Sequence, residues 1–161
     1  MANMTASTTR PWKGITQGLQ RYGMVGYTDI QSAAAEYTIY KGAVVCIDVS
    51  DVDGYAQPFQ SGITAAGDDV FLGVAAEERS VTSSDTSQGD VNILVWTKGK
   101  VGFAVASLTV TDIGAPIYAD DDQVVTTTST NNLWIGTLSS VDATYAWVNI
   151  EHASGRVNSA T

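Results

Sequence analysis

The feature that most constrains the fold is a succession of short apolar runs, each of strand length. Between residues 37 and 150, β-branched and aromatic residues come in short groups, and Gly, Asp, Asn and Ser cluster between the groups. Such alternation is typical of all-β sandwiches and barrels, because turn residues reverse the chain between short strands. We therefore predict an all-β protein with a single compact β-barrel or sandwich-like domain.

The eight predicted strands cover residues 43–48, 70–75, 91–97, 101–105, 116–119, 123–127, 134–138 and 145–150. In the third, alternation puts Ile93 on one face and Trp96 on the other, so both faces carry bulk and the strand should be central. Lys98 and Gly99 follow it and predict a tight hairpin to the fourth strand, with Gly99 at positive φ. Pro116 cannot donate to a ladder, so it should begin its strand or lie on an edge.

An internal repeat links two parts of the body. Residues 42–43 and 114–115 are both Gly-Ala, and each pair opens an apolar strand followed by an acidic turn. In each part an apolar strand with a central glycine comes next, Gly73 in the first and Gly136 in the second. Two similar halves explain this order. Chance resemblance between short strands with Gly-rich turns is the alternative, and both explanations stay open.

The ends of the chain differ from the body in composition. Residues 1–36 are rich in Thr and Gly and predict an extended N-terminal arm, with at most a short helix over residues 28–36, where Thr28 and Gln31 have capping-box spacing. Residues 151–161 are polar and predict a flexible C-terminal tail that frays or lies on a neighbour. The expected organisation is therefore an arm, a β domain over residues 37–150, and a tail.

Charge and cysteine content exclude several classes of function. Eight Lys and Arg against 17 Asp and Glu give a formal charge of −9, which repels a phosphate backbone and argues against nucleic acid as a partner. Cys46 is the sole cysteine, so no intrachain disulfide is expected and folding in a reducing cytoplasm fits. Residues 1–17 do not resemble a signal peptide. The best apolar stretch, residues 101–110, is far shorter than a membrane-spanning helix needs.

Residues able to do catalytic chemistry are few. His152 is the sole histidine and ends the last predicted strand, so we expect it to be exposed and not a general base. Cys46 alternates within an apolar strand and is expected to be buried. Carboxylates occur at Asp48, Asp51, Asp53, Asp120, Asp121 and Asp122. Their spacing does not match an EF-hand, so solvated turn carboxylates are the expectation, and no metal, no cofactor and no catalytic residue is predicted. A hydrolase that uses these acids with a metal is the enzymatic alternative.

The arm carries the residue types that dominate protein interfaces. These candidate partner-binding residues are Arg10, Trp12, Lys13, Arg21, Tyr22 and Tyr27. Arg, Trp and Tyr are enriched among interface hot spots, and the basic residues of the arm precede the first acid, Asp29. The alternative is that Trp12 folds back onto its own body.

Several motifs together resemble the capsid cement, or head decoration, proteins of tailed bacteriophages. In the first half they are Lys41-Gly42 before an apolar strand, Phe71-Leu72-Gly73-Val74-Ala75-Ala76-Glu77, and Gly89-Asp90-Val91. In the second half they are residues 111–121 (Thr-Asp-Ile-Gly-Ala-Pro-Ile-Tyr-Ala-Asp-Asp), Trp134-Ile135-Gly136, and Trp147-Val148-Asn149-Ile150. The resemblance covers about residues 41–150, and the long arm departs from a minimal cement domain.

The resemblance implies a structural role in the virion. Such proteins are all-β, often trimeric, and clamp neighbouring capsomers from outside the shell. It therefore implies a homotrimer that is made in the host cytoplasm and binds the major capsid protein on the outer capsid surface, with neither membrane nor nucleic acid as a partner. A phage tail or fibre component, or a virion surface protein that recognises a host, is the alternative within the binding class.

Overall fold

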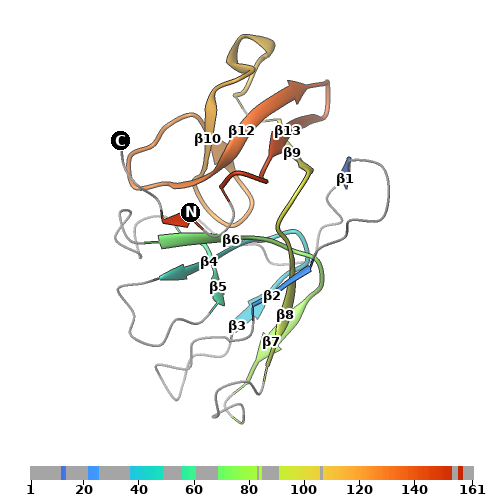
Figure 1. Cartoon of the computed structure of the whole chain (residues 1–161), viewed down its shortest axis with the longest axis vertical. Coiled ribbons are helices and arrows are strands. Elements are labelled where there is room, and N and C mark those ends of the chain that lie inside the picture. Colours follow the sequence, from blue (N-terminus) through green and yellow to red (C-terminus); the bar gives the residue numbers. More distant parts are fainter. Residues whose placement is uncertain are drawn as a thin grey trace.

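The computed structural model describes residues 12–13, 22–25, 37–48, 56–60, 69–82, 84, 91–105, 107–153 and 156–157 (Figure 1). Regular structure in these residues is β-strand, apart from one 3-10 turn, η1 (Val110–Asp112). The prediction of an all-β protein is confirmed. The predicted helix at residues 28–36 lies outside the described residues.

The described residues form two large antiparallel sheets and one small sheet. Sheet A runs in the order β1 (Trp12–Lys13), β9 (Lys100–Ala104), β13 (Tyr145–Asn149), β12 (Leu133–Val141), β10 (Pro116–Ala119) and β11 (Val125–Thr126). Sheet B runs in the order β2 (Tyr22–Val25), β8 (Ile93–Trp96), β6 (Asp69–Ala75), β4 (Val44–Asp48) and β5 (Ala56–Pro58), and β14 (Arg156–Val157) also pairs with β6. Sheet C pairs β3 (Tyr37–Ile39) with β7 (Arg79–Val81). Figure 1 shows β10, β12 and β13 of sheet A, in orange and red, above β4, β5 and β6 of sheet B, in teal and green.

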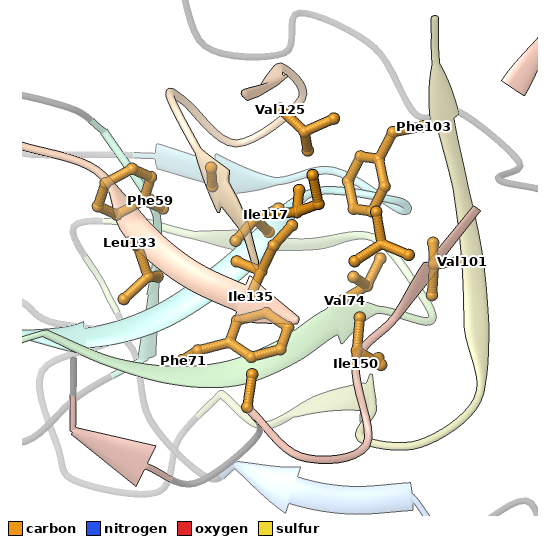
Figure 2. Packing of buried hydrophobic residues seen from close by; sticks show 14 of the residues in the cluster. Phe59, Phe71, Val74, Val101, Phe103, Ile117, Val125, Leu133, Ile135 and Ile150 are labelled. Carbon is orange, nitrogen blue, oxygen red and sulfur yellow. The ribbon is translucent and has the colours of Figure 1, made fainter. Parts of the chain in front are cut away.

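The main core lies between sheets A and B. Phe71 and Val74 of sheet B pack there with Ile117, Ile135 and other residues of sheet A, all of them buried, and Figure 2 shows these side chains pointing toward one another. A second core lies on the opposite face of sheet B, where Val45, Ile93 and Val95 pack against Ile39 of sheet C. Burial of apolar side chains is the main stabilising contribution to folding, so sheet B, which is buried on both faces, is the centre of the molecule.

The two halves of the body have the same strand order. In sheet B the order is β5-β4-β6-β8, and in sheet A it is β11-β10-β12-β13. A bulge interrupts both central pairings at the same place: Val45 pairs with Gly73 and Cys46 with Phe71, while Ile117 pairs with Gly136 and Tyr118 with Trp134. The repeat read from the sequence is therefore a structural repeat, and chance resemblance between strands does not account for a shared topology and register.

Hydrogen bonds outside the ladders also repeat. The N–H of Gly42 donates to the carbonyl oxygen of Ala75 at 2.8 Å, and that of Gly114 donates to Leu138 at 2.9 Å. The next strand along the sheet corresponds too. β2 lies against β8 as β9 lies against β13. Residues 22–25, which we placed in the arm, are thus the counterpart of β9 and belong to the repeat.

The two halves pack face to back. The front face of each half is defined here as the face that carries Val45 in the first and Ile117 in the second, and the back face as the opposite one. The front of the first half packs against sheet C, whereas the front of the second half packs against the back of the first. At this junction the N–H of Val44 donates to the carbonyl oxygen of Asp122 at 2.8 Å. The position equivalent to Val44 in the second half is Pro116, which has no N–H.

The predicted hairpin between the third and fourth strands is wrong. β8 pairs with β2 and β6 in sheet B, whereas β9 pairs with β1 and β13 in sheet A. Lys98 and Gly99 instead carry the chain from one sheet to the other, and Gly99 has the expected positive φ, 99°. A turn residue allows the chain to change direction, but it does not determine which strand pairs with the next one. The other predictions for these segments are confirmed: β8 is flanked on both sides with bulk on both faces, and Pro116 begins β10.

Gly73 and Gly136 occupy the position where each half has least room. A Cβ on Gly73 would lie 2.3 Å from the carbonyl oxygen of Trp96, and one on Gly136 would lie 2.2 Å from that of Asn149. Their φ angles, 155° and 151°, are also ones that other residues rarely adopt. Neighbouring backbone cannot move aside without breaking the sheet, so glycine is required at both positions.

We predict that Gly73→Ala and Gly136→Ala each lower the free energy of unfolding by about 2 to 4 kcal/mol, because a methyl group collides with backbone. Gly114→Ala is the matched control. Its φ is also positive, 91°, but a Cβ there meets nothing within 4 Å, so backbone strain alone should cost about 1 kcal/mol. Urea unfolding of the three variants measures the difference. Equal losses at all three positions would contradict the close-contact explanation.

Candidate functional site

The six interface residues proposed for the arm are only partly described. Trp12 and Lys13 form β1, whose backbone pairs with Val101 and Lys100 at the edge of sheet A. Tyr22 begins β2 and pairs with Trp96. Arg10, Arg21 and Tyr27 lie outside the described residues. The backbone of Trp12 therefore folds back onto its own domain, while the partner-binding role of these residues stays a prediction.

A loop that the sequence analysis did not single out presents large apolar side chains to solvent. It comprises residues 108–115, hereafter the η1 loop, and joins residue 107 to β10. Leu108 at its start is buried, but Val110 is 66% exposed and Ile113 is 51% exposed. These are the two most exposed large apolar side chains among the described residues. Single exposed apolar residues are common on protein surfaces, so two on one short loop need a closer examination of how the loop is held.

Hydrogen bonds hold the η1 loop in one conformation. The Asp112 carboxylate oxygen Oδ2 accepts from the backbone N–H of Thr109 at 2.7 Å and from the Thr109 hydroxyl at 2.9 Å. The far end of the loop is fixed to β12, because Gly114 donates to Leu138 and the N–H of Leu138 donates to Ala115 at 3.0 Å. Val110 and Ile113 therefore lie on a preorganised surface, and less conformational entropy is lost when a partner covers them.

A sequence signal for these two residues exists in retrospect. Val110 and Ile113 flank a Thr-Asp pair directly before Gly114, at the end of an apolar stretch that is too long for one strand. Thr109 and Asp112 have the three-residue spacing that caps a short helical turn. A short helical turn ends the strand, so the apolar residues within it no longer alternate between two faces of a sheet. The capping spacing is therefore the sequence signal, and strand periodicity alone does not detect it.

The acidic turn after β10 is structural and is not solvated, contrary to our expectation. Asp121 is 3% exposed and Asp122 is 1% exposed. The Oδ1 atom of Asp121 accepts from the backbone N–H groups of Gln123 at 2.8 Å and Val124 at 2.6 Å. Asp favours turns for this reason, since its side chain bonds to backbone two or three residues on. Here the turn also faces the first half, through the bond from Val44 and a bridge between Gln60 and Asp121.

His152 and Cys46, the other residues with catalytic potential, have different environments. His152 is exposed and Cys46 is fully buried in the main core, as predicted for each. Within the described ranges, no group of three or more His, Cys, Asp or Glu side chains is arranged to hold a metal ion. Asp48 has no described side chain, and Asp51 and Asp53 lie outside the described residues. The candidate site that the described residues support best is the exposed apolar surface of the η1 loop.

Comparisons with protein-family models, with curated proteins and with solved structures find no match to this chain. Among the described residues, no helix has the length and apolar character needed to cross a membrane. The resemblance to cement proteins thus rests on the motifs in the sequence.

We predict that Asp121→Ala lowers the free energy of unfolding by about 1 to 3 kcal/mol, because it leaves two backbone N–H groups in the junction turn without their acceptor. Asp121→Asn keeps a side-chain carbonyl oxygen and should lose less than Asp121→Ala. Urea unfolding monitored by tryptophan fluorescence measures both. If the alanine variant is as stable as the wild type, the turn does not hold the two halves together in the way described.

Proposed function

We propose that this chain is a structural virion protein that binds the outer surface of an assembled phage capsid and cements neighbouring capsomers. The observation that carries the proposal is the η1 loop, which holds Val110 and Ile113 rigidly in solvent. Apolar side chains fixed in this way gain free energy when a partner removes them from water. The resemblance of residues 41–150 to cement proteins supplies the identity of the partner, the major capsid protein.

Linkage explains how such a protein stabilises a shell. A ligand that binds the assembled shell but not its dissociated subunits stabilises assembly by RT ln(1 + [L]/Kd) per site, about 2.7 kcal/mol at a hundredfold excess over Kd. If the protein is a homotrimer, as the resemblance implies, the second and third contacts become intramolecular once the first is made. Modest contacts by each η1 loop then suffice for tight retention.

The first test changes the η1 loop. Val110→Asp with Ile113→Asp should weaken co-sedimentation with purified expanded shells at least about tenfold, because two carboxylates replace the apolar contact. Val124→Asp is the matched control. Val124 is 36% exposed and its backbone N–H bonds to Asp121, so its side chain can change without loss of that bond. The control should sediment with shells as the wild type does.

Stoichiometry decides between the capsid and the alternatives. Saturable binding to shells in a fixed ratio to capsid protein supports the proposal. Binding to host cells without binding to shells would contradict it and favour a host-recognition protein. A double variant that retains full affinity for shells would remove the η1 loop from the interface.

The second test removes the start of the arm. Deleting residues 1–13 takes away Arg10, Trp12 and Lys13 together with β1, and it leaves β2 in place. We expect shell binding to weaken because interface-type residues are lost, while the domain stays folded because β1 pairs only at the edge of sheet A. Co-sedimentation measures binding, and thermal unfolding of the deleted protein measures fold. Wild-type affinity of the truncated protein for shells would show that the arm has no part in attachment.

A further inference from the structure

The back face of the second half has the composition of a binding surface. In the first half, the back face carries Val44, Cys46, Phe71 and Val74, and all four are buried against the second half. The equivalent positions in the second half are Pro116, Tyr118, Trp134 and Thr137. Pro116 is exposed and the other three are half-buried. A face that is a dry contact in one half is thus an aromatic and polar surface in the other.

Aromatic side chains lie on three strands of this face. Tyr118 of β10 pairs directly with Trp134 of β12. On β13, Tyr145 and Trp147 alternate with Ala146, and their rings meet edge to face, with centroids 5.7 Å apart. Tyr145 is half-buried, whereas Trp147 is only 4% exposed and offers little surface to a partner. Residues that alternate along a strand share a face, so Tyr118, Trp134 and Tyr145 extend from the face of sheet A opposite to the one that carries Ile117, Ile135 and Ala146. Trp134 is half-buried and also packs against the main core. Tyr and Trp offer large contact area and are enriched at interfaces.

The indole N–H groups of both tryptophans form hydrogen bonds within the domain. The indole N–H of Trp134 donates to the carbonyl oxygen of Gly136 at 2.8 Å, so the ring is held along its own strand. The indole N–H of Trp147 donates to Oδ2 of Asp142 at 2.7 Å. Of these two indoles only Trp134 has accessible surface, and with its N–H engaged inside the domain it can interact through its ring face. Aromatic ring faces are electron-rich and attract cations.

The charged residue nearest to Tyr118 in the sequence is an acid, the half-buried Asp120, which follows directly after β10. Residues 107–153, all of them described, contain no Lys or Arg. On their surface they carry Asp112, Asp120 and Asp142, whereas Asp121 and Asp122 are buried at the junction with the first half. Glu151 forms an ion pair with Lys98 at 3.5 Å, and the basic Lys100 of β9 lies opposite Asn149, three strands away from Tyr118. Aromatic rings with an acid beside them attract cations and repel acidic partners. Arginine fits it better than lysine, because the planar guanidinium stacks on aromatic rings and is less strongly hydrated than an ammonium group.

We infer that the back face of the second half, centred on Tyr118 and Trp134, binds a basic, arginine-bearing segment of a partner protein. The inference rests on the proposed function only in that the protein is a binding module, and it names the chemistry of the partner. A peptide titration tests the face without any shell. The two proposals can therefore fail independently.

The experiment titrates the full-length protein at low salt with a peptide of alternating arginine and glycine, and it follows tryptophan fluorescence and heat of binding. Peptides with lysine or glutamate in place of arginine are compared. We expect the arginine peptide to bind most tightly, the lysine peptide more weakly, and the glutamate peptide not at all. Equal binding of the arginine and lysine peptides would overturn the inference, because charge alone would then explain it.

Matched variants locate the site. Tyr118→Ser should weaken arginine-peptide binding about two- to fivefold, the usual range for a cation over an exposed ring, and Tyr118→Phe should restore it. Tyr40→Ser is the control. Tyr40 is also half-buried but packs against the second core, on the front of the first half. Unchanged binding by Tyr118→Ser, or an equal loss in Tyr40→Ser, would overturn the assignment.

Shell binding separates the two proposals. If the wild type binds shells but not the arginine peptide, the back face has been assigned wrongly and the proposed function stands. If it binds the arginine peptide through Tyr118 but does not bind shells, the assignment stands and the capsid is not the partner.

Discussion

The contact on which the rest of the structure depends is the packing of one half's back face on the other half's front face. It makes sheet B apolar on both sides, with Phe71 and Val74 toward sheet A and Val45 and Val95 toward sheet C. A sheet buried on both faces needs a cover for each. The second half provides one cover and the short β3–β7 pair provides the other. Sheet A meets this demand on one side only, so its outer side is available for polar and aromatic residues.

Much of this fold could be predicted from the sequence because strand periodicity is a local property. All eight predicted strands correspond to observed ones, namely β4, β6, β8, β9, β10, β11, β12 and β13. β3, β5 and β7 were missed because they are short and carry residues such as Thr38, Gln57 and Arg79, whose strand conformation comes from pairing and not from apolar alternation. The sequence also did not predict that the strand after Gly99 joins a different sheet from the strand before it, because sheet membership depends on contacts between residues distant in sequence.

For the candidate sites too, the sequence predicted what depends on residue type and did not predict what depends on contacts between distant residues. Residue type was enough to mark Trp12 and Tyr22 as interface-like, but not to place their backbones on the edges of sheets A and B. Val110 and Leu108 are similar in kind and close in sequence, yet one is exposed and the other is buried. The η1 loop makes that distinction through hydrogen bonds to Asp112 and β12, and apolar pattern alone contains no trace of them.

Pro116 has a consequence for how many such units can be joined. In a face-to-back array, the first residue of each leading strand donates an N–H to the unit stacked behind it, as Val44 does to Asp122. Repeat proteins commonly end in a unit whose outer side cannot accept another. Proline at the matching position in the second half has no N–H, so a third unit stacked on this side would lack the hydrogen bond that joins the first two, which disfavours further stacking there.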